Sequence, residues 1–324
     1  MNDLSAPSVS VILPILNEES DLENCITAIL QQDYDGELEV ILALGPSKDS
    51  TDLIAQKIAA KDKRVKLVKN PTGLTAAGLN LAIKASSFEI ICRIDGHAEI
   101  SKTYIKSAVS IMKETGAVNV GGIMFADSDQ GLQRTVAQAM RSKLGVGPSK
   151  FHTGGGAGES ETVYLGTFKK SAILAAGGFD ERFIRAQDWE LNYRIRKQGG
   201  LIWFDPRLVV TYRPRKTFSK LARQYFQYGR WRRVITRTHS NTSSLRYLAP
   251  PFAVVVNLLS LVSGVFVTPL LLLPLMVYIF TMVIGGFLIG RKITDKLLMP
   301  LVLATMHMSW GLGFITSPKN LLKG

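Results

Sequence analysis

Four short groups of polar residues stand out in this 324-residue chain, because their types and spacing could support chemistry. In chain order they are Pro14-Ile-Leu-Asn17-Glu18, Arg93-Ile-Asp95-Gly-His97, Gln187-Asp188-Trp-Glu190 and Gln227-Tyr-Gly-Arg230-Trp231. Asp95 and His97 alternate at the end of an expected strand, so both side chains can point into one site. Mg²⁺ and Mn²⁺ prefer hard oxygen ligands, and Mn²⁺ accepts imidazole as well. The pair could therefore hold a divalent cation, although an Asp-X-His pair taken alone is more often structural than metal-binding.

Each group has a structural alternative when it is taken alone. Asp95 and His97 could cap a loop, and Asp188 could cap its helix, where a carboxylate is favoured. The group at Gln227 could be a solvated helix face with one aromatic residue. All four groups occur in one order and on elements of the expected types, and this combination favours an active site.

The elements that must position these groups follow an α/β pattern. Strands are expected at 8–13, 38–42, 65–68 and 88–94, and helices at 21–31, 51–60 and 74–86. This alternation predicts a mostly parallel sheet covered by helices. Ligands bind such sheets beyond the carboxyl ends of the strands, which here are residues 14–18, 45–49, 70–73 and 95–97. The later part is less regular, with a glycine-rich loop at 152–158, a strand at 163–168 and a helix within 179–198.

The C-terminal third has the composition of a membrane region. No charged residue occurs in the 44 positions from Tyr247 to Gly290, and about 20 apolar residues are enough for a helix to cross a bilayer. Pro269 divides this run, which predicts spans at 252–268 and 270–290. A third apolar stretch at 297–316 either spans or re-enters the membrane.

The net charge of +13 is concentrated beside these spans, because no Asp or Glu occurs between Pro206 and Thr294. Residues 216–237 place aromatic and aliphatic side chains on one helical face and cations on the other. This pattern predicts an amphipathic helix in the membrane interface, and the alternative is a surface helix packed on the soluble domain. Anionic lipid therefore accounts for the basic charge better than nucleic acid does.

Cysteine usage and the N-terminal sequence indicate a cytosolic catalytic part. Cys25 and Cys92 lie in expected elements without metal-ligand spacing, so two reduced, packed thiols are expected. The first residues lack the basic and apolar regions of a signal peptide, so the membrane anchor is expected at the C-terminal end.

With these motifs in this order, residues 8–231 resemble the inverting, membrane-associated glycosyltransferases of family 2, which have a GT-A fold. The bacterial exopolysaccharide type, similar to the ExoA-like succinoglycan glucosyltransferases, is the nearest in character. The resemblance implies a nucleotide-sugar donor and a divalent cation, Mn²⁺ or Mg²⁺. It also implies a GT-A domain at 1–212, a basic amphipathic interfacial segment at 213–246 and a membrane domain at 247–324.

The resemblance assigns roles to individual residues. Asp188 matches the catalytic base, which removes the proton of the acceptor hydroxyl, while Glu190 lies about 200° further around the helix. Asp95 and His97 match the cation ligands. The nucleotide-binding side would comprise Pro14, Asn17, Glu18, Asp49, Asn80, Arg93 and Asp95, although Arg93 suits a structural salt bridge equally well. Contacts to the acceptor or the diphosphate would come from Gly154, Gly155, Gly156, Gln187, Gln227, Arg230 and Trp231.

Two positions depart from the family pattern. Leu44 replaces the aspartate that usually recognises the nucleotide base, and Gln187 replaces the acidic residue before the catalytic carboxylate. We expect transfer of a single sugar, from a donor that is UDP-linked by analogy, to a lipid-linked glycan or a surface polysaccharide. The expected location is the cytosolic face of the plasma membrane, in a multi-pass protein. The alternatives are a polyprenyl-phosphate sugar synthase and a non-enzymatic, membrane-tethered nucleotide-binding protein.

Overall fold

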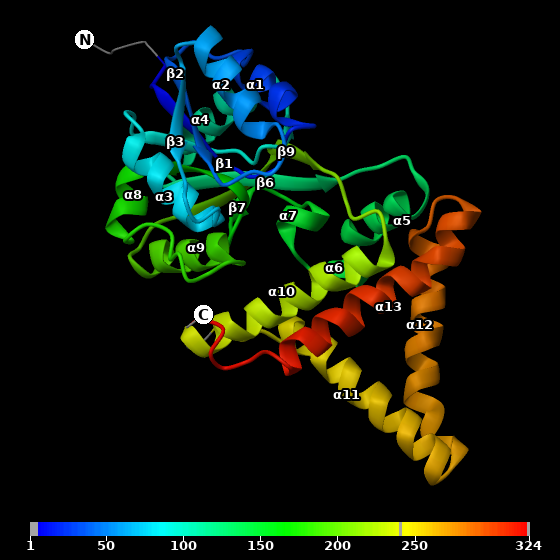
Figure 1. The fold of residues 1–324 in the computed structure, drawn as a ribbon. Coiled ribbons are helices and arrows are strands. Elements are labelled where there is room, and N and C mark those ends of the chain that lie inside the picture. The colour runs from blue at the N-terminus through cyan, green and yellow to red at the C-terminus, as the bar shows by residue number, and fades with distance from the viewer. Residues whose placement is uncertain (1–5, 240–241, 323–324) are drawn as a thin grey trace. The chain divides into compact units, whose positions relative to one another are not determined.

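A computed structural model describes residues 6–239 and 242–322 and divides the chain into two compact units. The first, which we call the sheet unit, comprises Met1–Met124 and Gly154–Tyr212. The second, the helical unit, comprises Phe125–Thr153 and Arg213–Gly324. Figure 1 shows the elements of both units.

The sheet unit is built on one mixed sheet with the strand order β3-β2-β1-β4-β8-β6-β9-β5, and β7 pairs with β9. Strands β3, β2, β1 and β4 are parallel, whereas β8 pairs antiparallel with both β4 and β6. The strands are β1 (Val9–Ile15), β2 (Leu38–Leu44), β3 (Val65–Lys69), β4 (Ile90–Arg93), β5 (Glu99–Ile100), β6 (Asn119–Ala126), β7 (Gly158–Glu159), β8 (Tyr164–Lys169) and β9 (Ile202–Tyr212). The predicted α/β class is confirmed.

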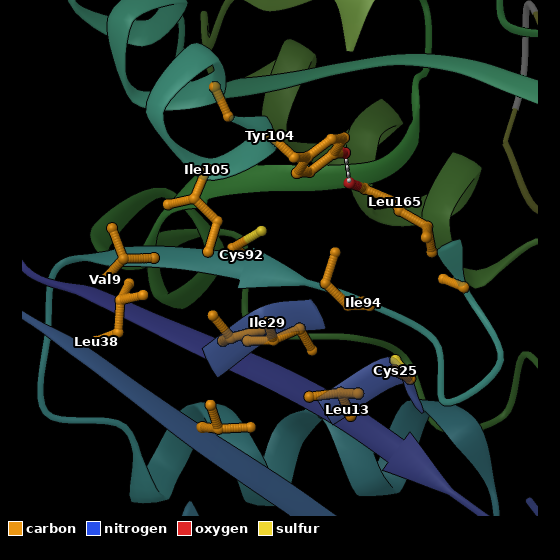
Figure 2. Packing of buried hydrophobic residues seen from close by; sticks show 14 of the residues in the cluster. Val9, Leu13, Cys25, Ile29, Leu38, Cys92, Ile94, Tyr104, Ile105 and Leu165 are labelled. Atoms are coloured by element: carbon orange, nitrogen blue, oxygen red, sulfur yellow. Dashed lines mark hydrogen bonds between the residues drawn. The ribbon is translucent and has the colours of Figure 1, made fainter. Parts of the chain in front are cut away.

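Helices cover both faces of the parallel strands. They are α1 (Leu22–Leu30), α2 (Thr51–Lys61), α3 (Thr75–Ala85), α4 (Tyr104–Thr115), α8 (Lys170–Ala175) and α9 (Gln187–Lys197). Alternate residues of β1 point to opposite faces, so Val9 and Leu13 pack with Ile29 of α1 and Ile105 of α4 in one core (Figure 2). The small Gly78 lets α3 approach the other face at Pro14 and Ala43.

The predicted elements of the first half lie where the structure has strands and helices. One difference is informative: β1 continues through Pro14 to Ile15, although the strand was expected to end at Pro14. Proline has no N–H to donate to a neighbouring strand. It is tolerated because the pairing of β1 with β4 ends at Ile12, so only β2 lies beside Pro14.

The helical unit contains α5 (Gly131–Met140), α6 (Lys143–Val146), α7 (Lys150–Thr153), α10 (Phe218–Thr238), α11 (Leu245–Phe266), η1 (Pro269–Leu272), α12 (Leu273–Ile289) and α13 (Ile293–Ile315). Three helical segments among the described residues are long and apolar enough to cross a membrane: Leu245–Phe266, Pro269–Ile289 and Ile293–Ile315. The predicted amphipathic helix is α10, which packs along α13 within this unit.

Residues 125–153 had been expected in the catalytic domain, and in the structure they pack with the C-terminal helices. The reason is a fully buried carboxylate, that of Asp295 in the first turn of α13. Arg134, Thr135 and Gln138 of α5 donate hydrogen bonds to it over 2.9–3.1 Å. A buried charge needs such partners, so α5 and α13 are held together by one ion pair and its hydrogen bonds.

A second buried carboxylate, that of Glu39, stabilises the sheet unit and gives its folding a pH dependence. It accepts hydrogen bonds from Ser10 Oγ, the Ser87 N–H and Lys66 Nζ at 2.5–2.6 Å. Burial opposes the charged form, but these hydrogen bonds outweigh it and lower the pKa of Glu39 below its ordinary value of 4.5.

We therefore expect the free energy of unfolding to fall as the pH drops below about 4.5, because the unfolded chain then binds a proton that folded Glu39 resists. Glu39→Gln should lower stability at pH 7 by about 1–3 kcal/mol and flatten this acid dependence. Thermal unfolding of the full chain in detergent, measured between pH 3.5 and 7, tests it. The exposed Glu37→Gln is the control, and an unchanged acid slope in the Glu39 variant would contradict the prediction.

Candidate active site

Arg93 stands between the two carboxylates that the sequence singled out. Its guanidinium donates to Asp95 Oδ1 at 3.0 Å and is paired with Asp188 Oδ1 as well. The Arg93 side chain is 5% exposed, whereas those of Asp95 and Asp188 are 23% and 33% exposed. The structure thus brings Asp95 and Asp188 together, although they are far apart in the chain, and both remain reachable from solvent.

The backbone explains how these residues meet. Arg93 is the last residue of β4, and Asp95 lies in the turn that follows. Asp188 is the second residue of α9. The helix begins directly after Ala186, whose φ of +61° is unusual for a residue with a side chain. This left-handed residue turns the chain sharply into the helix. It places the Asp188 carboxylate in the first turn, where the helix dipole favours negative charge.

The electrostatic balance around Asp188 favours proton uptake. Burial raises the pKa of Asp188, the Arg93 guanidinium lowers it, and the nearby Asp95 carboxylate raises it again. The net effect is a pKa above the ordinary aspartate value of 3.8. A carboxylate with a raised pKa is a stronger base than a free aspartate, so Asp188 is suited to accept a proton.

His97 is held by Glu18 from the first group. The His97 Nδ1 atom lies 2.9 Å from Glu18 Oε1, and hydrogen bonding to Glu18, against the cost of burial, raises the pKa of His97. Gly96 permits the contact, because a Cβ atom there would lie 3.1 Å from Glu18 Cγ and 2.8 Å from Ile15 Cδ1. In the neutral ring, donation from Nδ1 to Glu18 leaves the other ring nitrogen with its lone pair.

The loops after β1 and β2 are fastened to each other, which fixes Glu18. Asn17, at φ +55°, accepts a hydrogen bond from the Lys48 N–H. The Glu18 N–H donates to Thr51 Oγ1 at 2.8 Å, and that hydroxyl in turn donates to Asp49. The hydrogen bond from Thr51 also lowers the pKa of Asp49. Asn17 and Asp49, predicted to face a nucleotide, are thus engaged in joining the two loops.

Cys25 supports the Asp95 turn from behind, a role that the sequence did not indicate. Its buried thiol donates to the Asp95 carbonyl oxygen at 3.4 Å. Burial raises the pKa of Cys25 to about 12, so the thiol keeps the proton that it donates. No motif spacing reports this contact, because the two residues lie on different elements.

Other predicted residues line or brace the same region. Asn80 uses both ends of its amide on the segment before α9: its Oδ1 accepts from the Phe179 N–H, and its Nδ2 donates to Glu181. Gln187 is nearly buried at the start of α9. Glu190 is 2% exposed and pairs with Arg194 at 2.6 Å, so its carboxylate is taken up by a structural ion pair.

The remaining predicted contacts belong to the glycine loop and to α10. Gly154 and Gly155 have φ of +76° and +141°, which favour glycine, and a Cβ atom at Gly156 would meet nothing within 4 Å. In the helical unit, the buried Arg230 Nε lacks a hydrogen-bond partner among the described residues. Trp231 is 4% exposed, which favours packing over stacking on a sugar.

The metal-binding side chains of the sheet unit fit a divalent cation that takes its remaining ligands from a substrate. Asp95 offers a carboxylate oxygen and His97 an imidazole nitrogen, both acceptable to Mn²⁺. Within the described residues, no group of three or more His, Cys, Asp or Glu side chains could hold a metal ion. Mg²⁺ bound with substrate phosphates needs only one or two protein carboxylates, so the two side chains suffice when a diphosphate supplies further oxygens.

Comparisons with known proteins address the chain as a whole. The family model described as "Glycosyl transferase family 2" matches residues 10–173. The succinoglycan biosynthesis protein ExoA of Rhizobium meliloti is 30% identical over 97% of this chain and 96% of its own length. A dolichyl N-acetyl-α-D-glucosaminyl phosphate 3-β-D-2,3-diacetamido-2,3-dideoxy-β-D-glucuronosyltransferase of Methanococcus voltae is 26% identical over 98% of each chain.

Solved structures share the fold. The mannosyltransferase PcManGT of Pyrobaculum calidifontis, in complex with GDP-Man and Mn²⁺, superposes with a TM-score of 0.60. The alignment covers 97% of this chain and 89% of PcManGT at 17% identity. The S. aureus protein TarS gives a TM-score of 0.52 at 15% identity and covers 95% of this chain and 90% of TarS.

Replacing Arg93 tests whether its cation holds the two carboxylates together. Arg93→Met should lower the free energy of unfolding by about 1–3 kcal/mol, because two carboxylates lose their shared partner. Adding Asp188→Asn to this variant should restore part of the loss, since one of the repelling charges is removed. Urea unfolding of the full chain measures both effects.

The matched control for this prediction is Arg64→Met, which breaks the exposed pair with Asp62. Its effect should stay below about 1 kcal/mol. Equal stability of the Arg93 variant and the unaltered chain would show that the buried cation is dispensable.

Proposed function

The chain belongs to glycosyl transferase family 2, and from this premise we propose that it transfers a sugar from a nucleotide-sugar donor to a lipid-linked glycan or surface polysaccharide, with inversion at the anomeric carbon. The predicted family and GT-A fold are confirmed by the family match and the structural neighbours. The observation that carries the proposed chemistry is the meeting of Asp95 and Asp188 on Arg93. One carboxylate can serve the leaving group and the other the acceptor.

In this proposal Asp188 is the general base. An inverting transfer removes the proton of the acceptor hydroxyl while the anomeric carbon is attacked from the side opposite the leaving nucleotide. One carboxylate is enough, because no covalent glycosyl-enzyme forms. The raised pKa and partial exposure of Asp188 support this role. The other acidic residue of α9, Glu190, is only 2% exposed, and this burial argues against its reaching an acceptor.

Asp95 and His97 would hold Mn²⁺ or Mg²⁺. When bound, the cation would stabilise the negative charge that develops on the departing diphosphate. Glu18 orients the His97 ring through Nδ1, and the carbonyl contact from Cys25 steadies the turn that carries Asp95. Buried Arg93 is engaged with protein carboxylates, which favours a structural and electrostatic role for it over direct phosphate binding.

The donor side would be formed by Pro14 of β1, by Asn17, Glu18 and Asp49 in the loops after β1 and β2, and by Asn80 of α3. We propose a UDP-linked donor. Base recognition must use other groups than the usual aspartate, because Leu44 occupies that position. The GDP-Man in the PcManGT complex shows that this fold accommodates a different base in another protein. A screen of nucleotide sugars therefore has to include guanosine as well as uridine donors.

For the acceptor we propose contacts from the open loop at Gly154–Gly156 and from Gln187. Gln227, Arg230 and Trp231 of α10 stay predicted contacts to the acceptor or the diphosphate. The Methanococcus voltae relative is named for action on a dolichyl-linked sugar phosphate. This supports a hydroxyl on a lipid-linked saccharide as the acceptor, rather than the lipid phosphate itself.

We further propose a functional division into a catalytic domain at 1–212, an interfacial segment at 213–246 and a membrane domain at 247–324. The catalytic domain would lie at the plasma membrane and face the cytosol, which is the compartment where nucleotide sugars are made. The three apolar helices and the relative named for a dolichyl-linked sugar phosphate support this location.

A donor screen tests the proposed function. Purified full-length protein is heated with UDP- and GDP-sugars in the presence of Mn²⁺ or Mg²⁺, because a bound donor raises the unfolding temperature. The donor that shifts the transition is then incubated with protein and membrane extract. Release of the nucleoside diphosphate and formation of a labelled lipid-linked product are expected. Failure of every donor to give diphosphate would refute the proposal.

Asp188→Asn tests the base. The variant should lose transfer by about 10²–10⁴-fold, because the amide cannot accept the hydroxyl proton. The donor-induced thermal shift should persist, since the substitution keeps the shape of the side chain. Retained transfer would favour a phosphate acceptor, which is already nucleophilic and needs no base, and would thus support a polyprenyl-phosphate sugar synthase.

Glu18→Ala tests the orientation of His97. Removing a group that orients a metal-bound histidine typically weakens metal binding by about 10–100-fold. Glu18→Gln should bind Mn²⁺ better than Glu18→Ala, because its amide oxygen still accepts from Nδ1. Titration of Mn²⁺ in the presence of nucleoside diphosphate, followed by electron paramagnetic resonance, measures this. Exposed Glu23→Ala is the control, and equal Mn²⁺ affinity of Glu18→Ala and the unaltered protein would refute the role.

A further inference from the structure

The first turn of α13 is packed against charged, water-soluble parts of the helical unit. Asp295 is fully buried and accepts from Arg134, Thr135 and Gln138 of α5, as described above. The Arg291 N–H before the helix donates to Gln138 Oε1 at 3.0 Å. This end of α13 is therefore bound to a helix that carries an arginine and several amides.

The middle and the last turns of α13 are covered in the same way. His307 Nε2 donates to the Leu144 carbonyl oxygen of α6 at 2.8 Å. Further along, α10 approaches so closely that a Cβ atom at Gly229 would lie 1.9 Å from the Trp310 carbonyl oxygen. A Cβ atom at Gly313 would likewise lie 2.0 Å from that of Phe226.

Contact with α10 continues beyond the end of α13. The Arg233 guanidinium lies 5.0 Å from the centre of the Phe314 ring. Arg237 donates to the Ser317 carbonyl oxygen at 3.0 Å. From residue 295 to 317, α13 and the residues after it thus have α5, α6 and α10 as successive neighbours.

Those neighbours cannot enter the hydrocarbon core. The helical unit contains 19 Lys and Arg but only three Asp and Glu, namely Asp127, Asp129 and Asp295. Cations on its α5, α6 and α10 are Arg134, Lys143, Lys220, Arg223, Arg230, Arg232, Arg233 and Arg237. If α13 crossed the bilayer, its length of about 35 Å would distribute these cations through the whole core, where each is costly.

The outer side of α13 carries a stripe of exposed apolar side chains. Its members recur at helical spacing and are 45–65% exposed: Ile293, Leu297, Leu301, Leu312 and Ile315. One buried side and one exposed apolar stripe are what a helix lying in the membrane interface needs. The helices α11 and α12 differ, because they expose ten and nine large apolar side chains, against five in α13.

We propose that α13 lies in the plane of the membrane surface together with α10, and that the α11–α12 hairpin alone crosses the bilayer. The partner of the apolar stripe is then the upper acyl-chain region of one leaflet, and the cations beside it meet anionic headgroups. In consequence, residues after α13 lie on the same side of the membrane as residues before α11. This topology stands apart from the proposed reaction.

Cysteine labelling in sealed membrane vesicles tests the topology. Ser243→Cys precedes α11, Thr268→Cys lies at the tip of the hairpin and Lys319→Cys follows α13; all three native side chains are exposed. The unaltered chain is the background control, since Cys25 and Cys92 are buried. With a maleimide that does not cross membranes, Ser243→Cys and Lys319→Cys should react in vesicles of one orientation, and Thr268→Cys in the other.

If Lys319→Cys reacted in vesicles of the same orientation as Thr268→Cys, the proposal would be overturned, because α13 would then cross the bilayer. If Thr268→Cys reacted in vesicles of the same orientation as Ser243→Cys, the α11–α12 hairpin would not cross the bilayer, and the proposal would be wrong. No outcome depends on catalytic activity, so failure of this topology and failure of the proposed function are distinguishable.

The depth of α13 provides an independent measurement. Nitroxide labels at Leu297→Cys, Leu301→Cys and Leu312→Cys should report similar, shallow depths, from their relative accessibility to oxygen and to a water-soluble nickel chelate. The matched control is α11, where labels at the exposed Val255, Leu259 and Val262 should show graded depths. A depth maximum near the middle of α13, as in α11, would refute the in-plane arrangement.

Discussion

A single guanidinium shared by two carboxylates determines the geometry of the candidate active site. Arg93 is buried at the end of β4, and its planar fork of donors reaches Asp95 and Asp188 at once. Without the Arg93 guanidinium, the two carboxylates would repel each other at short range. With it, Asp95 after β4 and Asp188 on α9 are held together around a buried guanidinium, and both carboxylates stay partly exposed.

This arrangement also sets the charge of the site. Asp188 is partly screened by Arg93, yet burial and Asp95 keep its pKa above that of a free aspartate. A lysine at position 93 would present a point charge instead of a fork, and it could not satisfy two carboxylates in the same geometry. The identity of the residue thus matters as much as its charge.

Much of this molecule could be predicted from its sequence because the signals are local. The strands and helices up to Ile94 follow hydrophobic periodicity, and the carboxyl ends of parallel strands gather at one edge, which places Asp95 beside the loop of Glu18. Pairing of side chains was harder. Arg93 suited two roles, and the ion pairs that distinguish them join residues as far as 95 positions apart. The Glu18–His97 contact depends on the missing Cβ of Gly96, which no motif reports.

Residues 125–153 were expected in the soluble domain because they precede the change of composition near residue 206. Their partner, Asp295, lies more than 150 positions away in an apolar helix. The segment between β6 and β7, which contains α5, α6 and α7, therefore belongs to the same compact unit as the C-terminal helices. A shortened protein ending at Tyr212 would keep Arg134, Thr135 and Gln138 but lose the Asp295 carboxylate that they share. The α5 side chains that bind Asp295 would then be exposed without their partner. Aggregation of such a fragment would reflect the loss of this contact and not an inability of the sheet to fold.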